Sequence, residues 1–177
     1  MRVFTSLSRD DQFRLYVTRQ RGSLLRMATL LSYGNPHRAE DLVQTVLLRL
    51  YLSWTKVRSD TRDAYVHKML VNAHLDERRR RHVRHEVPHA EVPDVESVED
   101  AEPLDIEATV FRALAQLPPR MRAAVILRYV YDVSVADTAD ALGCSEGTVK
   151  SQTARGLAQM RAALNGIAIV EKGHGHE

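Results

Sequence analysis

Apolar residues recur at helical spacing along most of this chain, and short polar or proline-containing breaks separate the segments that carry them. The breaks hold helix-starting residues such as Ser8 and Asn35, and a helix-stopping pair, Pro118-Pro119. Helices are predicted over 8–31, 37–54, 61–81, 106–117, 119–132, 135–142 and 145–164. Because every predicted element has the helical period, the expected fold is all-α.

The stretch from Val133 to Leu164 predicts two helices that are joined by a tight turn. Gly143 follows the last apolar residue of the first helix, where a left-handed backbone ends a helix, and Ser145 can cap the second. Ala139, Gly143 and Val149 have the spacing of a helix-turn-helix. The small Ala139 lets the two helices cross closely, Gly143 makes the turn, and the branched Val149 fills the space between the helices. The inner face of the second helix carries Val149, Thr153, Gly156 and Met160.

The outer face of that second helix carries short polar and cationic residues, which suit contact with a DNA groove. Its members are Glu146, Gly147, Thr148, Lys150, Ser151, Gln152 and Arg155. An ordinary helical hairpin with solvated charges is the alternative interpretation. Because the turn, the cap and the outer-face chemistry agree, we favour DNA binding.

The predicted helix 61–81 combines an apolar face with a polar stripe that ends in arginines. The apolar face is formed by Val66, Met69, Leu70 and Ala73, and the opposite stripe by Lys68, Asn72, Asp76 and Arg79. The run from Arg78 to Arg81 is what contact with nucleic-acid phosphates requires, although cations also suit a solvated helix C-terminus. A second DNA-reading element in the chain favours phosphate contact.

An acidic stretch divides the chain into two small helical domains. Residues 86–107 contain three prolines, many carboxylates and neither lysine nor arginine, which is typical of a flexible linker. We expect an N-terminal domain over 1–85, a linker over 86–105, a C-terminal helix-turn-helix domain over 106–168 and a disordered tail over 169–177. The linker acts either as a self-repelling spacer or as a partner for a positively charged surface.

Composition limits the classes of protein to which the chain can belong. Of 177 residues, 44% are hydrophobic, which is enough for real cores, and the net charge of only +2 means that a nucleic-acid binder must segregate its charge. No apolar run reaches the length of a membrane span, and no hydrophobic leader opens the chain. A single cysteine excludes an internal disulfide, so we expect a cytoplasmic protein without membrane insertion.

The sequence predicts no enzyme, no cofactor and no metal site. It has no phosphate-cradling glycine loop, metal-ligand cluster or nucleophile elbow. Cys144 lies in the predicted turn with no histidine near it in sequence, which argues against a hydrolase or redox enzyme. His174 and His176 alternate with glycine in the predicted tail and are too few to indicate a metal.

Together these segments resemble a known family. A basic three-helix domain precedes an acidic linker and a four-helix domain, with AEDLVQ and YVHKMLVNAHLDERRRR in the first domain and LPPRMRAAVILRY and LGCSEGTVKSQTARGLAQMR in the second. The chain is similar to the extracytoplasmic-function (group 4) sigma factors of bacterial RNA polymerase, especially the actinobacterial type. The resemblance spans about Phe13 to Arg161.

The resemblance implies a helix that binds core RNA polymerase. AEDLVQTVLLRLY matches the core-binding helix of the family, so Asp41, Gln44 and Arg49 are expected to face the clamp helices of the largest polymerase subunit. Thr45 stands where the family usually has glutamate. The resemblance also implies a contact with the polymerase flap, a linker that lies in the basic channel for RNA, and an anti-sigma factor as a further partner.

The resemblance places the single-stranded −10 promoter element on the arginine-ended helix. The residues expected to hold it are Lys68, Asn72, Asp76, Arg79 and Arg80. The turn 54–60 matches the loop that captures a flipped non-template base in the family. Trp54, which begins that turn, also suits a core position, and we favour the core.

The double-stranded −35 element is expected to meet the outer face of the helix-turn-helix. Base edges would be met by Glu146 or Thr148, and phosphates would be held by Lys150, Ser151 and Arg155. Gly147 would let the backbone approach closely, and Gln152 stands where many family members have arginine.

A conventional regulator that binds DNA alone through the same helix-turn-helix is the alternative function. This interpretation leaves the arginine-ended N-terminal domain and the acidic linker without a function. It would also usually require a dimerising surface, and the sequence shows no heptad seam. We therefore expect a sigma factor that gives core polymerase its choice of promoter.

Overall fold

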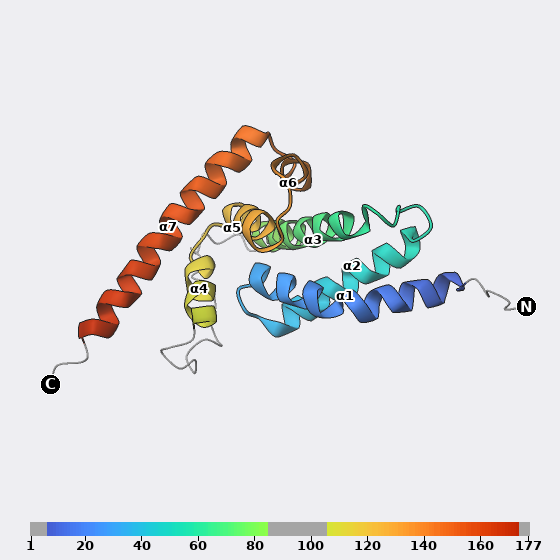
Figure 1. Cartoon of the computed structure of the whole chain (residues 1–177), viewed down its shortest axis with the longest axis horizontal. Helices are drawn as coiled ribbons and strands as arrows, with labels where there is room; N and C mark the ends of the chain where they lie inside the picture. The colour runs from blue at the N-terminus through green and yellow to red at the C-terminus, as the bar shows by residue number, and fades with distance from the viewer. Residues whose placement is uncertain (1–6, 85–105, 174–177) are drawn as a thin grey trace, which may run out of the picture.

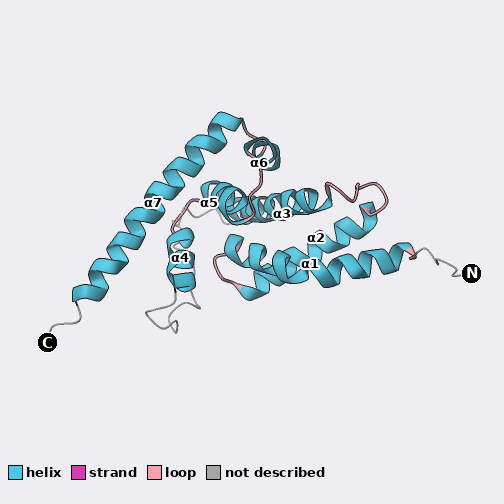
Figure 2. Ribbon diagram, viewed as in Figure 1, coloured by secondary structure: helices cyan, strands magenta, loops and turns pink. Residues whose placement is uncertain are grey.

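A computed structural model describes residues 7–84 and 106–173, and over these residues all regular secondary structure is helical (Figures 1 and 2). The elements in chain order are α1 (Arg9–Leu31), α2 (Pro36–Ser53), α3 (Arg62–Arg84), α4 (Ile106–Ala115), α5 (Pro119–Val125), a π-helical turn (Ile126–Val130), α6 (Val135–Leu142) and α7 (Glu146–Gly173). The prediction of an all-α fold is confirmed. The predicted acidic linker over 86–105 lies outside the described residues.

Side-chain caps start the helices where the sequence places them. The Ser8 hydroxyl accepts a hydrogen bond from the backbone N–H of Asp11 at 3.1 Å, and the Asn35 side-chain oxygen accepts one from the N–H of Arg38 at 2.9 Å. Each cap satisfies one of the free N–H groups of a first turn, and such a cap is worth about 1 kcal/mol. The predicted starts of α1 and α2 are therefore confirmed.

The N-terminal helices α1, α2 and α3 enclose an apolar core. On α3 the predicted inward residues Val66, Leu70 and Ala73 are buried, and Met69 is half-buried. Trp54 is only 4% exposed, which confirms its core position. Its ring packs edge-on against Phe13 and Tyr16 of α1, and the Arg62 guanidinium lies 3.7 Å from its centre. Ring packing and a cation over the ring hold the α2–α3 turn against α1.

The C-terminal helices pack around the inner face of α7. The predicted inner residues Val149, Thr153 and Gly156 are buried, and Met160 is half-buried. A Cβ at Gly156 would stand 2.7 Å from a methyl group of Val125 and 3.1 Å from the Met121 side chain. Helix α7 therefore crosses α5 at a distance that only glycine allows.

Replacing Gly156 by valine should lower the free energy of unfolding by about 2 kcal/mol, because the added atoms overpack a core that cannot shift cheaply. The matched control is Gly22→Val, since Gly22 also lies inside a helix but faces open space, with only the tip of Arg26 within 4 Å. We expect the control to leave stability within about 0.5 kcal/mol of the parent. Urea unfolding followed by circular dichroism measures both variants, and equal stability of the two would refute the close crossing.

The two sets of helices pack against each other, with α3 against α5 and α6 (Figure 1). The Tyr131 hydroxyl donates a hydrogen bond to the Ser23 carbonyl oxygen at 2.9 Å, and the His67 ring lies 4.8 Å from the Tyr131 ring. An ion pair of 2.6 Å joins Lys68 on α3 to Asp140 on α6. These contacts tie the N-terminal helices to the helix-turn-helix.

The C-terminal helix is longer than the sequence predicts. The predicted domain ends at residue 168 and a disordered tail is expected over 169–177, whereas α7 continues to Gly173. Extending an existing helix gains a backbone hydrogen bond for each added residue, and no proline interrupts the sequence here.

Among the described helices, none combines the length and the apolar character that a bilayer crossing requires.

Candidate promoter and polymerase interfaces

The turn between α6 and α7 has the geometry of a helix-turn-helix. Gly143 adopts φ +59°, the left-handed conformation predicted for it, and the N–H of Cys144 donates to the Ala139 carbonyl oxygen at 3.0 Å. The Ser145 hydroxyl accepts from the N–H of Thr148 at 3.2 Å and so caps α7. The predicted turn and cap are confirmed.

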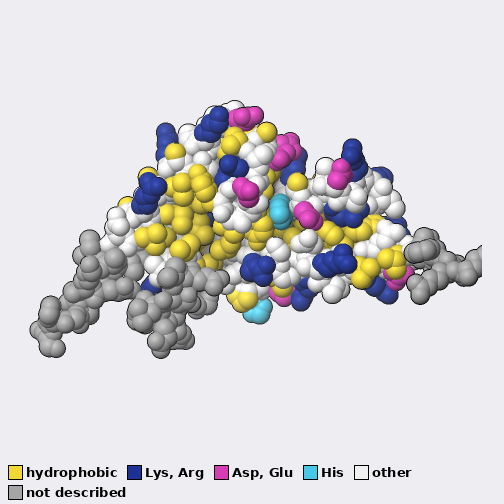
Figure 3. Space-filling view, viewed as in Figure 1, with side chains coloured by type: hydrophobic (Ala, Val, Ile, Leu, Met, Phe, Trp, Pro, Cys, Tyr) yellow, Lys and Arg dark blue, Asp and Glu magenta, His cyan; other side chains and the backbone are white. Residues whose placement is uncertain are grey.

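The outer face of α7 presents most of the predicted DNA-binding residues to solvent. The exposed members are Glu146, Gly147, Lys150, Ser151 and Arg155. Thr148 and Gln152 are half-buried instead, and the Gln152 side-chain oxygen is buried without a hydrogen-bond partner among the described residues. In Figure 3 lysine and arginine side chains follow the outer edge of α7, while hydrophobic side chains gather on its inner side near α4 and α5.

Helix periodicity splits the arginine run of α3 into two pairs. Arg79 and Arg80 are exposed, whereas Arg78 and Arg81 are half-buried on the side that faces α2 and the α1–α2 turn. Three residues of separation bring the second pair to one face of the helix. Arg79 and Arg80, for which the sequence predicts contact with DNA, are thus the fully exposed pair.

A groove of about 270 Å³ between α2 and α3 joins two of the predicted sites. Its polar lining consists of Asp41, Thr45 and Arg49 from α2, and Asp76, Glu77 and Arg80 from α3. Gln44 is exposed on α2 but does not line the groove. The structure therefore brings predicted polymerase-binding and −10-binding residues together around one mixed-charge depression.

The other predicted −10 residues lie nearer the middle of α3. Lys68 is occupied by its ion pair with Asp140, and its side chain is 37% exposed. Asn72 is half-buried, whereas Asp76 is exposed and lies 3.9 Å from Arg79. The ion pair of Lys68 joins residues that are 72 positions apart, which no local pattern indicates.

Two exposed leucines on α2 were missed by the sequence interpretation. Leu48 and Leu52 are 62% and 70% exposed and lie four residues apart, on one side of the helix. Neither leucine belongs to the apolar stripe that the sequence assigns to the core. Their position off that stripe could have indicated that they are exposed. Large apolar side chains in this arrangement are typical of an interaction surface.

The sequence interpretation also missed the buried Arg122 of α5. Its Nε donates to the Leu114 carbonyl oxygen at 2.8 Å, and its Nη2 donates to the Ala115 carbonyl oxygen, so the guanidinium caps the end of α4. The guanidinium carbon also lies 3.4 Å from the ring centre of Tyr33. Burial lowers the pKa of Arg122 to about 10, which leaves it charged at neutral pH. The local sequence gives no sign of this role, because Arg120 and Arg122 stand two positions apart and the pattern does not show which of them is buried.

His74 of α3 is buried among cations. Burial, followed by the charges of Arg122, Arg78, Arg81 and Arg38, lowers its pKa to about 4. The imidazole is therefore neutral at pH 7, and its Nε2 has no hydrogen-bond partner among the described residues.

Two sequence-family models match the chain on either side of the predicted linker. The model for sigma-70 region 2 matches residues 15–84, and the model for sigma-70 region 4 matches residues 108–160. The first range covers α3 and the α2–α3 groove, and the second covers the helix-turn-helix.

Curated relatives and solved structures agree with these matches. The RNA polymerase sigma-E factor of Streptomyces avermitilis is 37% identical over 155 residues, which are 86% of this chain and 85% of that protein. The ECF RNA polymerase sigma factor SigM of Mycobacterium tuberculosis H37Rv is 36% identical over 157 residues, covering 88% and 76%. The sigma factor RpoE of Bartonella quintana, solved in complex with the anti-sigma factor NepR, has the same fold, with a TM-score of 0.68 at 23% identity over 87% of this chain and 97% of that one. This chain belongs to the extracytoplasmic-function branch of the sigma-70 family of RNA polymerase sigma factors.

Proposed function

We propose that this chain joins core RNA polymerase and selects promoters through α3 and α7, which read the −10 and −35 elements. The observation that carries the proposal is the capped helix α7, whose outer face presents Lys150, Ser151 and Arg155 beside an exposed Gly147. Cations and a hydroxyl on an exposed helix suit DNA phosphates, and the absence of a Cβ on Gly147 permits close approach. Family membership supports the same function.

At the −35 element, the residues divide by chemistry. Lys150, Ser151 and Arg155 would hold phosphates, which position the helix, while Glu146 in the first turn would accept a hydrogen bond from a base edge. The Thr148 hydroxyl already bonds the Ser145 hydroxyl at 2.9 Å, so its role would be to fix the start of the helix more than to read a base.

At the −10 element, the exposed pair Arg79 and Arg80 would hold the backbone of the single strand. Lys68 can join them only when its ion pair with Asp140 opens. An exposed pair of this kind stabilises by about 1 kcal/mol or less, so DNA phosphates can replace Asp140 at small cost.

The core-binding surface would combine Asp41 and Arg49 with Leu48 and Leu52 on α2. The leucines would supply apolar area that is buried against the polymerase, and the charges would fix the register. Gln44, exposed beside them, would contribute a hydrogen bond. The expected partners are the clamp helices and flap of the polymerase, promoter DNA and an anti-sigma factor, and the place of action is the cytoplasm.

The role that follows is binding and positioning rather than catalysis. A regulator that binds DNA alone is the second candidate, and the helix-turn-helix is compatible with it. Membership of the sigma-factor family favours the sigma factor, and the exposed leucines of α2 offer apolar area that core polymerase could bury.

Replacing Asp41 by alanine should weaken binding to core polymerase about tenfold while leaving binding to a −35 duplex unchanged, because Asp41 lines the α2–α3 groove far from the outer face of α7. The matched control is Glu40→Ala, since the Glu40 carboxylate is paired with Arg21 of α1 at 3.1 Å instead of lining the groove. Fluorescence anisotropy with core polymerase and with duplex DNA measures both affinities. Equal loss of both affinities, with folding intact, would count against the separate surfaces.

A further inference from the structure

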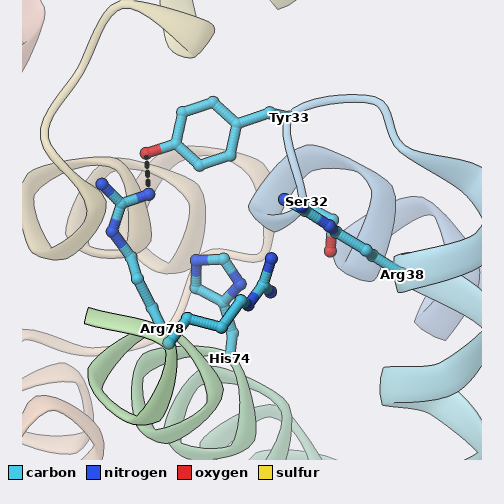
Figure 4. Close-up of a pocket in the computed structure, with 6 residues that line it drawn as sticks. Ser32, Tyr33, Arg38, His74 and Arg78 are labelled. Atoms are coloured by element: carbon cyan, nitrogen blue, oxygen red, sulfur yellow. Dashed lines mark hydrogen bonds between the residues drawn. The ribbon is translucent and has the colours of Figure 1, made fainter. Parts of the chain in front are cut away.

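A small cavity lies where the α1–α2 turn meets α3, next to α5 (Figure 4). Its volume is about 20 Å³, and it is lined by Ser32, Tyr33, Arg38, His74, Arg78 and Arg81. The Tyr33 hydroxyl accepts a hydrogen bond from Arg78 at 3.1 Å, drawn as the dashed line in Figure 4. None of these residues belongs to the polymerase-binding or promoter-binding surfaces proposed above.

The backbone around the cavity is held in an unusual conformation. Tyr33 adopts φ +60°, in the left-handed region that residues other than glycine rarely enter. This conformation places its ring between two cations, with the hydroxyl on Arg78 and the ring face on Arg122. Such strain persists only where surrounding contacts determine it, and it is often found at binding sites.

Buried hydrogen-bonding atoms around the cavity lack partners among the described residues. The atoms are Ser32 Oγ, His74 Nε2, Arg81 Nε and the Nη1 of the adjacent Arg122. Ser32, His74 and Arg122 are 2%, 6% and 0% exposed, so bulk water does not reach them freely. A buried donor without a partner costs about 1–3 kcal/mol, and several together indicate a missing acceptor.

The same place has an excess of positive charge. The charges of Arg38, Arg78, Arg81 and Arg122 all lower the pKa of His74. Arg81 is offset by its ion pair with Glu77, whereas Arg38, Arg78 and Arg122 have no ion-pair partner among the described residues. The Arg38 guanidinium makes no hydrogen bond or ion pair within the described part of the chain. One water molecule fits a cavity of this size, but it cannot offset these charges.

We propose that this cavity binds a single small oxyanion of the phosphate class, which holds the α1–α2 turn, α3 and α5 together. One oxygen of the ion occupies the cavity and accepts from the unpartnered donors, while the exposed Arg38 at the rim reaches its other oxygens. Arginine suits this task, because its planar fork of donors matches an oxyanion. A backbone phosphate of DNA is a poorer occupant, because Ser32 and His74 are enclosed between helices.

Titration calorimetry of the full chain with potassium phosphate, against potassium chloride at matched ionic strength, tests the proposal. We expect a saturable signal with one phosphate bound per chain, and a saturable rise of a few degrees in the Tm. Arg38→Gln and Arg78→Gln should each weaken phosphate binding about tenfold or more, because each removes a charged donor. The matched control is Arg79→Gln, which removes the same charge from an exposed neighbour outside the cavity and should leave phosphate affinity within about twofold.

Three results would overturn the proposal. The first is the lack of a saturable phosphate signal, and the second is equal weakening in the Arg78 and Arg79 variants, which would indicate general attraction to the arginine run. The third is displacement of phosphate by a single-stranded oligonucleotide in the Arg79→Gln variant, which would make the occupant a DNA phosphate. If Arg78→Gln does not fold by circular dichroism, Arg38→Gln carries the test, because the Arg38 side chain is exposed.

Discussion

Replacing Arg155 by glutamate should weaken binding to a −35 duplex by about 10–100-fold and leave binding to core polymerase within about twofold. Arg155 is exposed on the outer face of α7, between two and three turns beyond the capped start of the helix, where a phosphate of the groove wall would lie. Glutamate removes a charged hydrogen bond and adds repulsion to the DNA backbone. The slope of log affinity against log salt concentration should also decrease in magnitude by about 1, which corresponds to the loss of one phosphate contact.

The matched control for this change is Arg161→Glu, which makes the same charge reversal on the same helix. Arg161 is exposed, but helical geometry places it about 120° around the helix axis from Arg155. We expect less than about a threefold loss for the control, from general electrostatics alone. Anisotropy titrations at several salt concentrations compare the two variants, and indistinguishable losses would mean that α7 does not dock on DNA through its outer face.

Replacing Arg122 by alanine should lower the free energy of unfolding by about 3 kcal/mol or more. The guanidinium is fully buried and donates to the carbonyl oxygens of Leu114, Ala115 and Leu117. Alanine removes all of these side-chain hydrogen bonds, so that the Leu114 carbonyl oxygen keeps only the N–H of Leu117, and it removes the cation that lies over Tyr33.

Arg120→Ala is the control, because Arg120 lies on the same helix and also donates to a carbonyl oxygen, that of Leu142, but is exposed. Water can replace an exposed donor, so we expect a loss of about 1 kcal/mol or less. Denaturant unfolding at pH 7 measures both variants. A loss for Arg122→Ala no larger than that for the control would show that the buried guanidinium contributes little to the fold.

The local features of the fold could be predicted from the sequence, because short-range chemistry determines them. Asn35 and Ser145 are good caps wherever a helix follows them, and Gly143 is the residue that a left-handed helix end requires. Burial of Val66 and Val149 follows from apolar spacing within a single helix.

The relations between helices could not be predicted, because they depend on residues that are far apart in the chain. The pairing of Lys68 with Asp140 and the stacking of Arg122 on Tyr33 require the packed tertiary arrangement. The division of the arginine run into an exposed and an inward pair was readable in principle from helix periodicity. The role of the inward pair could not be predicted, because it depends on partners that the α1–α2 turn supplies.

For the residues of the candidate sites, the sequence predicted the helix on which each lies more reliably than how exposed each is. Most of the outer face of α7 is exposed as expected, but Gln152 is half-buried and Lys68 is engaged in an ion pair. Accessibility depends on the neighbouring helices, and a helical pattern reports only the average direction of a side chain.

The central claim is that the chain directs core polymerase to promoters, and run-off transcription tests it most directly. The purified chain would be mixed with core RNA polymerase, isolated as a complex and supplied with genomic fragments as templates. We predict a stoichiometric complex and transcripts that start at defined sites, which disappear with Arg155→Glu although the complex still forms. Tight, specific DNA binding by the chain alone, without a complex and without defined transcripts, would contradict the account and favour a regulator that binds DNA on its own.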